Sequence, residues 1–198
     1  PVSWTEVVNA STIGNSLMKA GGCGGCPDAG AVSAQSISSG DGFVEFTAPE
    51  TGTLRFIGLS TGNGGTDPGE IKFALRLQNG NVEVRESGAY RTETPFAAND
   101  VLRVAYVGGT VQYSKNGNVF YTSGNGPVYP AIVDTTLFDE LGMSMPELFT
   151  FKADDGVTDL ERQFLEVGRP EDAEQRGEDV PDEGGDHCAE RGADDDGD

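Results

Sequence analysis

The sequence of 198 residues predicts an all-β fold, an antiparallel sandwich followed by an acidic tail. Three observations predict it. Apolar and polar side chains alternate with a period of two in short segments of residues 1–152, as they do in strands that bury one face. Gly, Asn, Asp or Pro bound most of these segments. No stretch of ten or more residues there carries a helical apolar stripe, so the crossover helices of a parallel sheet are missing.

The alternation is clearest in six segments of the sandwich region. They are residues 43–47, 54–59, 71–77, 82–85, 101–107 and 111–114. Three residue pairs between alternating segments can adopt the positive φ angles of tight hairpins, namely Asn79-Gly80, Gly108-Gly109 and Asn116-Gly117. About ten antiparallel strands fit a region of this length, and the inner faces of two sheets would share one core.

Strand-like runs also open and close the sandwich region. The first spans residues 2–8 and contains Trp4, and the last spans residues 143–151. In many β-sandwiches the first and last strands pair with each other, which protects both ends of the domain. We expect that pairing here.

Most of the negative charge lies beyond the sandwich region. The chain has 33 acidic and 13 basic side chains, a net charge of −20, and residues 151–198 carry 18 of the acidic and 5 of the basic ones. A surface this acidic repels nucleic-acid phosphates and anionic lipid head groups. No apolar run reaches the ~18 residues of a membrane span, and no signal segment opens the chain. Because the chain begins at Pro1 without Met, we interpret it as a piece of a longer polypeptide whose further domains are candidate partners.

The tail, residues 153–198, differs in kind from the sandwich. It consists mainly of Asp, Glu, Gly, Arg and Pro, and such a composition buries too little apolar area to offset the entropy of ordering the chain. We expect a mostly irregular linker. One exception is the capping box Thr158-Asp159-Leu160-Glu161, which can start a short helix over residues 158–166 with Leu160 and Phe164 on one face.

Several motifs in residues 40–135 resemble those of concanavalin A-like sandwiches, especially SPRY-type domains. They are the strand entered after Asn99-Asp100, the hairpin that closes on Lys115-Asn116-Gly117, Tyr129-Pro130 before an apolar strand, and Ile57-Gly58-Leu59. The whole unit is also similar to lectin-like modules of secreted bacterial surface proteins. The resemblance implies a rigid jelly roll whose loops bind glycans or protein partners. The Cys23–Cys26 loop is not part of this pattern, and no legume-lectin metal site can be matched residue by residue.

Cys23 and Cys26 form a C-x-x-C motif among four glycines. The flexible backbone favours a local disulfide in an oxidising compartment. Two alternatives remain: a zinc site completed by His187 and Cys188, and a thioredoxin-like redox pair, which would lack its usual strand-to-helix junction. Cys188 has no obvious partner in the chain, which suggests a partner elsewhere.

The chain ends in Asp194-Asp195-Asp196-Gly197-Asp198. Carboxylates at Asp194, Asp196 and Asp198 resemble the start of an Asp-rich calcium loop, in which oxygen ligands at positions 1, 3 and 5 surround a hard cation. Calcium is therefore the leading candidate cofactor. The simpler interpretation is a solvated acidic linker.

Catalytic motifs are missing from the sandwich region. The single His lies in the tail, which leaves no Ser-His-Asp or Cys-His arrangement. Paired carboxylates of a glycosidase remain conceivable among Glu45, Glu83 and Glu86. However, Glu83 and Glu86 are three residues apart on one strand and should face opposite ways. A glycoside hydrolase is the weakest hypothesis.

Two polar loops, residues 61–69 and 123–129, have the composition of a ligand site. Side-chain amides and carboxylates can bind sugar hydroxyls, and an aromatic ring can pack on the C–H face of a sugar. The predicted ligand-binding residues are Asn63, Asp67, Tyr113, Asn116, Tyr121, Asn125 and Tyr129. The same residue types are also ordinary turn residues, and the tyrosines could equally be core residues.

The leading functional hypothesis is therefore a non-catalytic binding module, secreted or at the cell surface, that recognises a glycan or a surface protein through loops at one end of the sandwich. The alternative is a structural or adhesive repeat unit of a larger surface protein or filament, without a small ligand.

Overall fold

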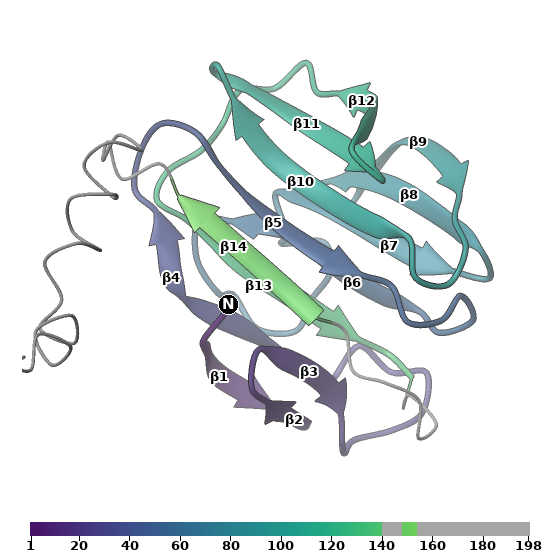
Figure 1. Ribbon diagram of the computed structural model, residues 1–198. Helices are drawn as coiled ribbons and strands as arrows, with labels where there is room; N and C mark the ends of the chain where they lie inside the picture. Colours follow the sequence, from purple (N-terminus) through teal and green to yellow (C-terminus); the bar gives the residue numbers. More distant parts are fainter. Residues whose placement is uncertain (140–147, 154–198) are drawn as a thin grey trace, which may run out of the picture. The chain divides into compact units, whose positions relative to one another are not determined.

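The computed structural model describes residues 1–139 and 148–153, and these form two layers of antiparallel β-sheet with no helix among them (Figure 1). The back layer has seven strands in the order β1 (Trp4–Val8), β4 (Gly30–Ile37), β13 (Ala131–Leu137), β6 (Arg55–Ser60), β7 (Phe73–Gln78), β8 (Asn81–Glu86) and β9 (Ala89–Pro95). The front layer has five, in the order β12 (Asn118–Thr122), β11 (Thr110–Lys115), β10 (Val101–Val107), β5 (Gly42–Thr47) and β14 (Leu148–Ala153). A small hairpin, β2 (Ala10–Ile13) with β3 (Ser16–Lys19), forms a separate two-stranded sheet whose Leu17 is part of the main core.

The antiparallel sandwich and all six clearest predicted strands are confirmed. Each predicted segment overlaps one of β5, β6, β7, β8, β10 and β11. The three predicted hairpins are also present, and both residues of each pair have positive φ, from 51° at Asn79 and Asn116 to 78° at Gly109 and Gly117. The described residues contain fourteen strands rather than about ten.

The expected pairing of the first and last strands is wrong. β1 pairs with β4, where Trp4 lies opposite Ser33, and β14 pairs with β5, where Phe151 lies opposite Val44. The two strands are therefore the outermost strands of different layers. Residues 143–147 of the predicted closing strand lie outside the described residues, as do the predicted helix 158–166 and the rest of the tail.

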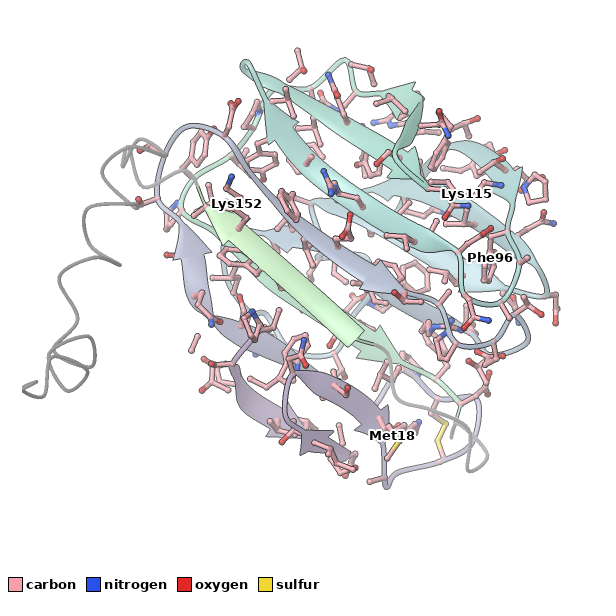
Figure 2. The ribbon with its side chains drawn as sticks, in the orientation of Figure 1. Met18, Phe96, Lys115 and Lys152 are labelled. Carbon is pink, nitrogen blue, oxygen red and sulfur yellow. A yellow bond between two sulfur atoms is a disulfide. The ribbon has the colours of Figure 1, made fainter. Side chains whose placement is uncertain are left out.

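The main core lies between the two layers, where alternate residues of each strand point inward. β8 shows this pattern plainly, because Val82 and Val84 are fully buried while Glu83 between them is half-buried on the other face. Phe96, labelled in Figure 2, follows β9 and fills the core at one end, where Lys115 Nζ donates a hydrogen bond to the carbonyl of Pro95.

A second, smaller apolar cluster lies on the outer face of the seven-stranded sheet. Phe56 and Ala74 point away from the main core and are covered by Ile71, which belongs to the segment between β6 and β7. Loop 61–72 thus folds back over the sheet instead of projecting from it. No helix of the described residues could span a membrane.

Candidate functional site

The two polar loops singled out in the sequence lie at the same end of the sandwich. Loop 61–69 follows Ser60, the last residue of β6, and Ser60 is paired with Ile132 near the start of β13. Loop 123–129 leads directly into β13. Because Ser60 and Ile132 are cross-strand neighbours, the two loops, which are about sixty residues apart in the chain, join the sheet at the same end.

Tyr129 is an exposed aromatic side chain of loop 123–129. It is 39% exposed, and its hydroxyl donates a hydrogen bond of 2.6 Å to the carbonyl of Gly40, between β4 and β5. Its ring meets that of buried Tyr106 edge to face, with 5.5 Å between centroids. Partial desolvation and the nearby Asp41 carboxylate raise the pKa of Tyr129. The ring is therefore held at the surface in a fixed orientation, with its hydroxyl protonated at neutral pH.

Asn125 is anchored to the sandwich by a buried carboxylate. Its amide donates to Glu86 Oε2 at 2.9 Å, and Arg91 Nε donates to the same oxygen at 2.9 Å. The Tyr113 hydroxyl donates to Glu86 Oε1 at 3.4 Å. Glu86 is 4% exposed, whereas the Arg91 side chain is exposed, and the Glu86 contacts tie the loop to β8 and β11.

Asn63 and Asp67 shape their own loop. Asn63 Oδ1 accepts the backbone N–H of Gly65, and Asp67 Oδ1 accepts that of Gly69, each at 2.8 Å. These are side-chain turns that fix a loop locally. Asn63 Nδ2 also donates to Glu6 Oε2 at 2.7 Å, which links the loop to β1.

The other three predicted ligand residues lie elsewhere. Tyr113 is fully buried, and burial together with the Glu86 carboxylate raises its pKa strongly. Half-buried Tyr121 lies opposite Tyr113 with ring centroids 5.8 Å apart, so the two rings do share a face, which is the core face. Asn116 belongs to the turn at the opposite end, where its amide donates to Asp100 Oδ1 and its Oδ1 accepts the N–H of Val101.

Two acidic residues that carry buried atoms were not predicted from the sequence. Asp134 on β13 is 3% exposed, and burial raises its pKa to about 7. Glu70, at the end of loop 61–69, has a buried Oε2 atom without a hydrogen-bond partner among the described residues. Asp134 could have been noticed as an acid within the apolar run Ala131 to Leu137, whereas Glu70 resembles any other loop acid.

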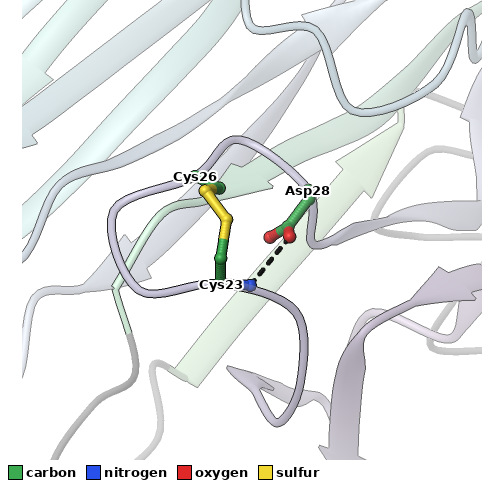
Figure 3. A group of neighbouring side chains, drawn as sticks. All are labelled: Cys23, Cys26 and Asp28. Carbon is green, nitrogen blue, oxygen red and sulfur yellow. Dashed lines mark hydrogen bonds between the residues drawn. A yellow bond between two sulfur atoms is a disulfide. The ribbon is translucent and has the colours of Figure 1, made fainter.

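Cys23 and Cys26 form the predicted disulfide, with 5.4 Å between their Cα atoms (Figure 3). Lys19 holds the loop from inside: its fully buried Nζ donates to the carbonyls of Cys23 and Cys26 at 2.8 and 2.9 Å and to Asp28 Oδ1 at 2.6 Å. The hydrogen bond from Lys19, and then that from the Cys23 N–H, lower the pKa of Asp28.

This loop has a partial metal-ligand geometry. Ligand atoms of Cys23, Cys26 and Asp28 lie within 4.8 Å of one another. In the disulfide the two sulfurs are bonded to each other, and the Asp28 carboxylate faces the Lys19 ammonium, so the set does not present thiolates to a metal. The remaining ligands of the zinc alternative, His187 and Cys188, and the predicted calcium ligands Asp194, Asp196 and Asp198 lie outside the described residues.

The three acids considered for glycosidase chemistry are placed apart. Glu83 pairs with Arg76 and Arg85 on the outer face of the back layer, and Glu45 pairs with Arg103 on the front layer. Glu86 points into the core, so Glu83 and Glu86 face opposite ways as the odd spacing predicts.

Comparison with solved structures identifies the fold as the concanavalin A-like sandwich of SPRY and lectin-type domains. The TRIM65 PSpry domain superposes with a TM-score of 0.55 at 15% identity, over 77% of this chain and 92% of that one. The human HERC1 SPRY domain gives 0.53 at 11% identity, over 77% and 99%. The metal-free carbohydrate recognition domain of Emp46p gives 0.53 at 13% identity, over 75% and 87%. No family model and no curated protein matches the sequence.

Proposed function

We propose that the chain is a non-catalytic saccharide-binding module whose ligand binds at the end of the sandwich formed by loops 61–69 and 123–129. The observation that carries the proposal is the Tyr129 ring, which is exposed but fixed by Gly40 and Tyr106. A tyrosine face held in this way can pack on the C–H surface of a sugar at little cost in side-chain entropy.

The polar residues at this end support the proposal. Asn63, Asp67 and Asn125 are oriented by internal hydrogen bonds that use only part of their capacity, so amide and carboxylate groups remain for sugar hydroxyls. The Emp46p domain of the same fold is a carbohydrate recognition domain. The dispersal of Glu45, Glu83 and Glu86 favours binding over hydrolysis, because a glycosidase needs two acids that flank one bond.

An oxidising setting follows from the same proposal. The Cys23–Cys26 disulfide supports a secreted or cell-surface location, where such bonds persist. Calcium at Asp194, Asp196 and Asp198 is proposed as a separate property of the tail, and binding should be measured both in EDTA and in calcium.

Replacing Tyr129→Ala should weaken saccharide binding by about five- to tenfold, because the aromatic contact is worth about 1–1.5 kcal/mol. The measurement is a glycan array on the full chain, followed by calorimetric titration of the best saccharide. Tyr129→Phe keeps the ring and should retain most of the affinity. Val119→Ala, an exposed apolar residue on β12 beside the opposite end, is the matched control and should bind like the wild type.

Equal affinity of the Tyr129→Ala variant would contradict the proposed site. Silence of the array together with capture of a defined protein would favour a protein partner at this surface. Release of reducing sugar from a bound glycan would show that the chain is an enzyme.

A further inference from the structure

Asp134 occupies an unusual position for a carboxylate. Its neighbours Val133 and Ala131 belong to the main core, so the alternation of β13 directs Asp134 to the outer face of the seven-stranded sheet. An outer face is normally wet, yet Asp134 is only 3% exposed. Its cross-strand neighbours are Val32 on β4 and Gly58 on β6, and neither carries a charge or a side-chain donor.

Loop 61–72 covers this part of the sheet. At one side Asn63 is bonded to Glu6 of β1, and at the other the N–H of Ser87, between β8 and β9, donates to the carbonyls of Ile71 and Lys72 at 3.2 Å. Ile71 is 1% exposed and packs on Phe56 and Ala74. The loop is thus fastened near both edges of the sheet, and we call residues 61–72 the strap.

Glu70 is itself a residue of the strap and brings a second carboxylate to its inner side. The Ser60 hydroxyl donates to its backbone carbonyl at 3.4 Å, while its side-chain Oε2 is buried without a hydrogen-bond partner among the described residues. Gly64 lies against this carboxylate, and a Cβ at Gly64 would collide with it. The strap therefore closes directly over the Glu70 carboxylate.

The charges that act on Asp134 are negative. Glu70 from the strap and Glu6 from β1 both disfavour its ionisation, although burial is the largest cause of its pKa near 7, and the Thr135 N–H partly offsets it. On the same row of the sheet, Arg85 is three strands away and is bonded to Glu83. Lys72 of the strap is exposed. Ionising Asp134 would add a negative charge to a poorly solvated part of the sheet where the carboxylates of Glu70 and Glu6 already oppose it, which is unfavourable.

We propose that the strap is a pH-sensitive element: residues 61–72 stay closed on the sheet while the buried Asp134 carboxyl group is protonated, and they loosen when that group ionises at higher pH. The ionised carboxylate can be solvated only if the strap lifts and admits water. This inference does not depend on the identity of a ligand, but it implies that Asn63 and Asp67 change position with pH.

The test is amide hydrogen exchange of the full chain between pH 5.5 and 8.5 in EDTA, with rates corrected for the intrinsic pH dependence. Protection of Gly65, Gly69 and Glu70 should fall by about tenfold as the pH rises from 6 to 8, as expected for a local opening equilibrium. Gly80, whose N–H is bonded to Thr51 at the opposite end, is the internal reference and should keep constant protection.

Two variants decide the outcome. Asp134→Asn should remove the pH-dependent fall in protection. Glu70→Gln removes one negative neighbour of Asp134 and should shift the fall to lower pH, which keeps the test available if the strand variant folds poorly. Glu93→Gln, an exposed carboxylate on β9, should retain the wild-type response. Flat protection in the wild type, or a fall that persists unchanged in both variants, would overturn the proposal. If millimolar calcium restored the protection of these amides at pH 8, Asp134 and Glu70 would be a cation site, and the proposal would also be overturned.

Discussion

Replacing Lys19→Met should lower the free energy of unfolding by about 3 kcal/mol or more, because removal of one partner leaves buried acceptors unsatisfied. The Lys19 side chain is completely buried, and its ammonium also donates to the carbonyl of Phe138 at 2.9 Å. Three backbone carbonyls from two distant parts of the chain therefore depend on one cation. Methionine restores the volume but supplies no donor.

This loss is measured by urea or thermal unfolding under non-reducing conditions, so that the Cys23–Cys26 bond is intact in both proteins. Lys152→Met is the control, because Lys152 is exposed on β14 (Figure 2), and its unfolding free energy should stay within about 0.5 kcal/mol of the wild type. A loss below about 1 kcal/mol for Lys19→Met would mean that water satisfies these carbonyl groups in place of the ammonium group. That result would contradict a stabilising role of Lys19.

Replacing Asp134→Asn should raise the free energy of unfolding, relative to the wild type, more at pH 8 than at pH 5. The folded-state pKa of Asp134 is raised to about 7, whereas the unfolded chain has a value of about 3.9, so the folded state holds a proton that the unfolded state has lost. Wild-type stability should therefore fall as the pH rises from about 4 to about 7, by up to about 4 kcal/mol for this group. Asparagine carries no charge at any of these pH values and should abolish that part of the slope.

The informative quantity is the difference between pH 5 and pH 8 within each protein, because it cancels pH-independent effects of the amide. Asp100→Asn is the matched control. Hydrogen bonds from the Ala97 N–H and the Asn116 amide lower the pKa of Asp100, so its charge changes below pH 4 and its removal should leave the slope between pH 5 and pH 8 unchanged. Parallel pH profiles for the wild type and Asp134→Asn would show that Asp134 is ionised in the folded protein throughout this range.

The sequence predicts the strands that bury one face and leave the other polar, because their period of two is visible. β5 and β8 are of this kind, with alternating buried and half-buried residues. β4 was not predicted, because its first four residues are all buried and its run of Ala and Ser has no polar alternation. β9 was missed for the opposite reason, since an edge strand such as Ala89–Pro95 is exposed or half-buried throughout.

The candidate site was predictable only in part. Loop composition points to residues 61–69 and 123–129, and this site stays a prediction. That both loops join the sheet at one end depends on the register of β6 against β13, which no local pattern reveals. Tyr113 and Tyr129 look alike in the sequence, and only the tertiary structure makes one a core residue and the other a surface residue. The same applies to Glu70, whose burial arises from the strap folding over it.

β13 is hydrogen-bonded to β4 on one side and to β6 on the other, so it holds the seven-stranded sheet together in its middle. β4 ends at Ile37 and β13 begins at Ala131, which means that this pairing closes a loop of more than ninety residues. Folding of such non-local sheets is typically slow, on the order of milliseconds to seconds. During synthesis the back layer would remain two separate fragments until residue 137 has left the ribosome, and a chain cut short before β13 would expose the unpaired edges of β4 and β6 to other chains.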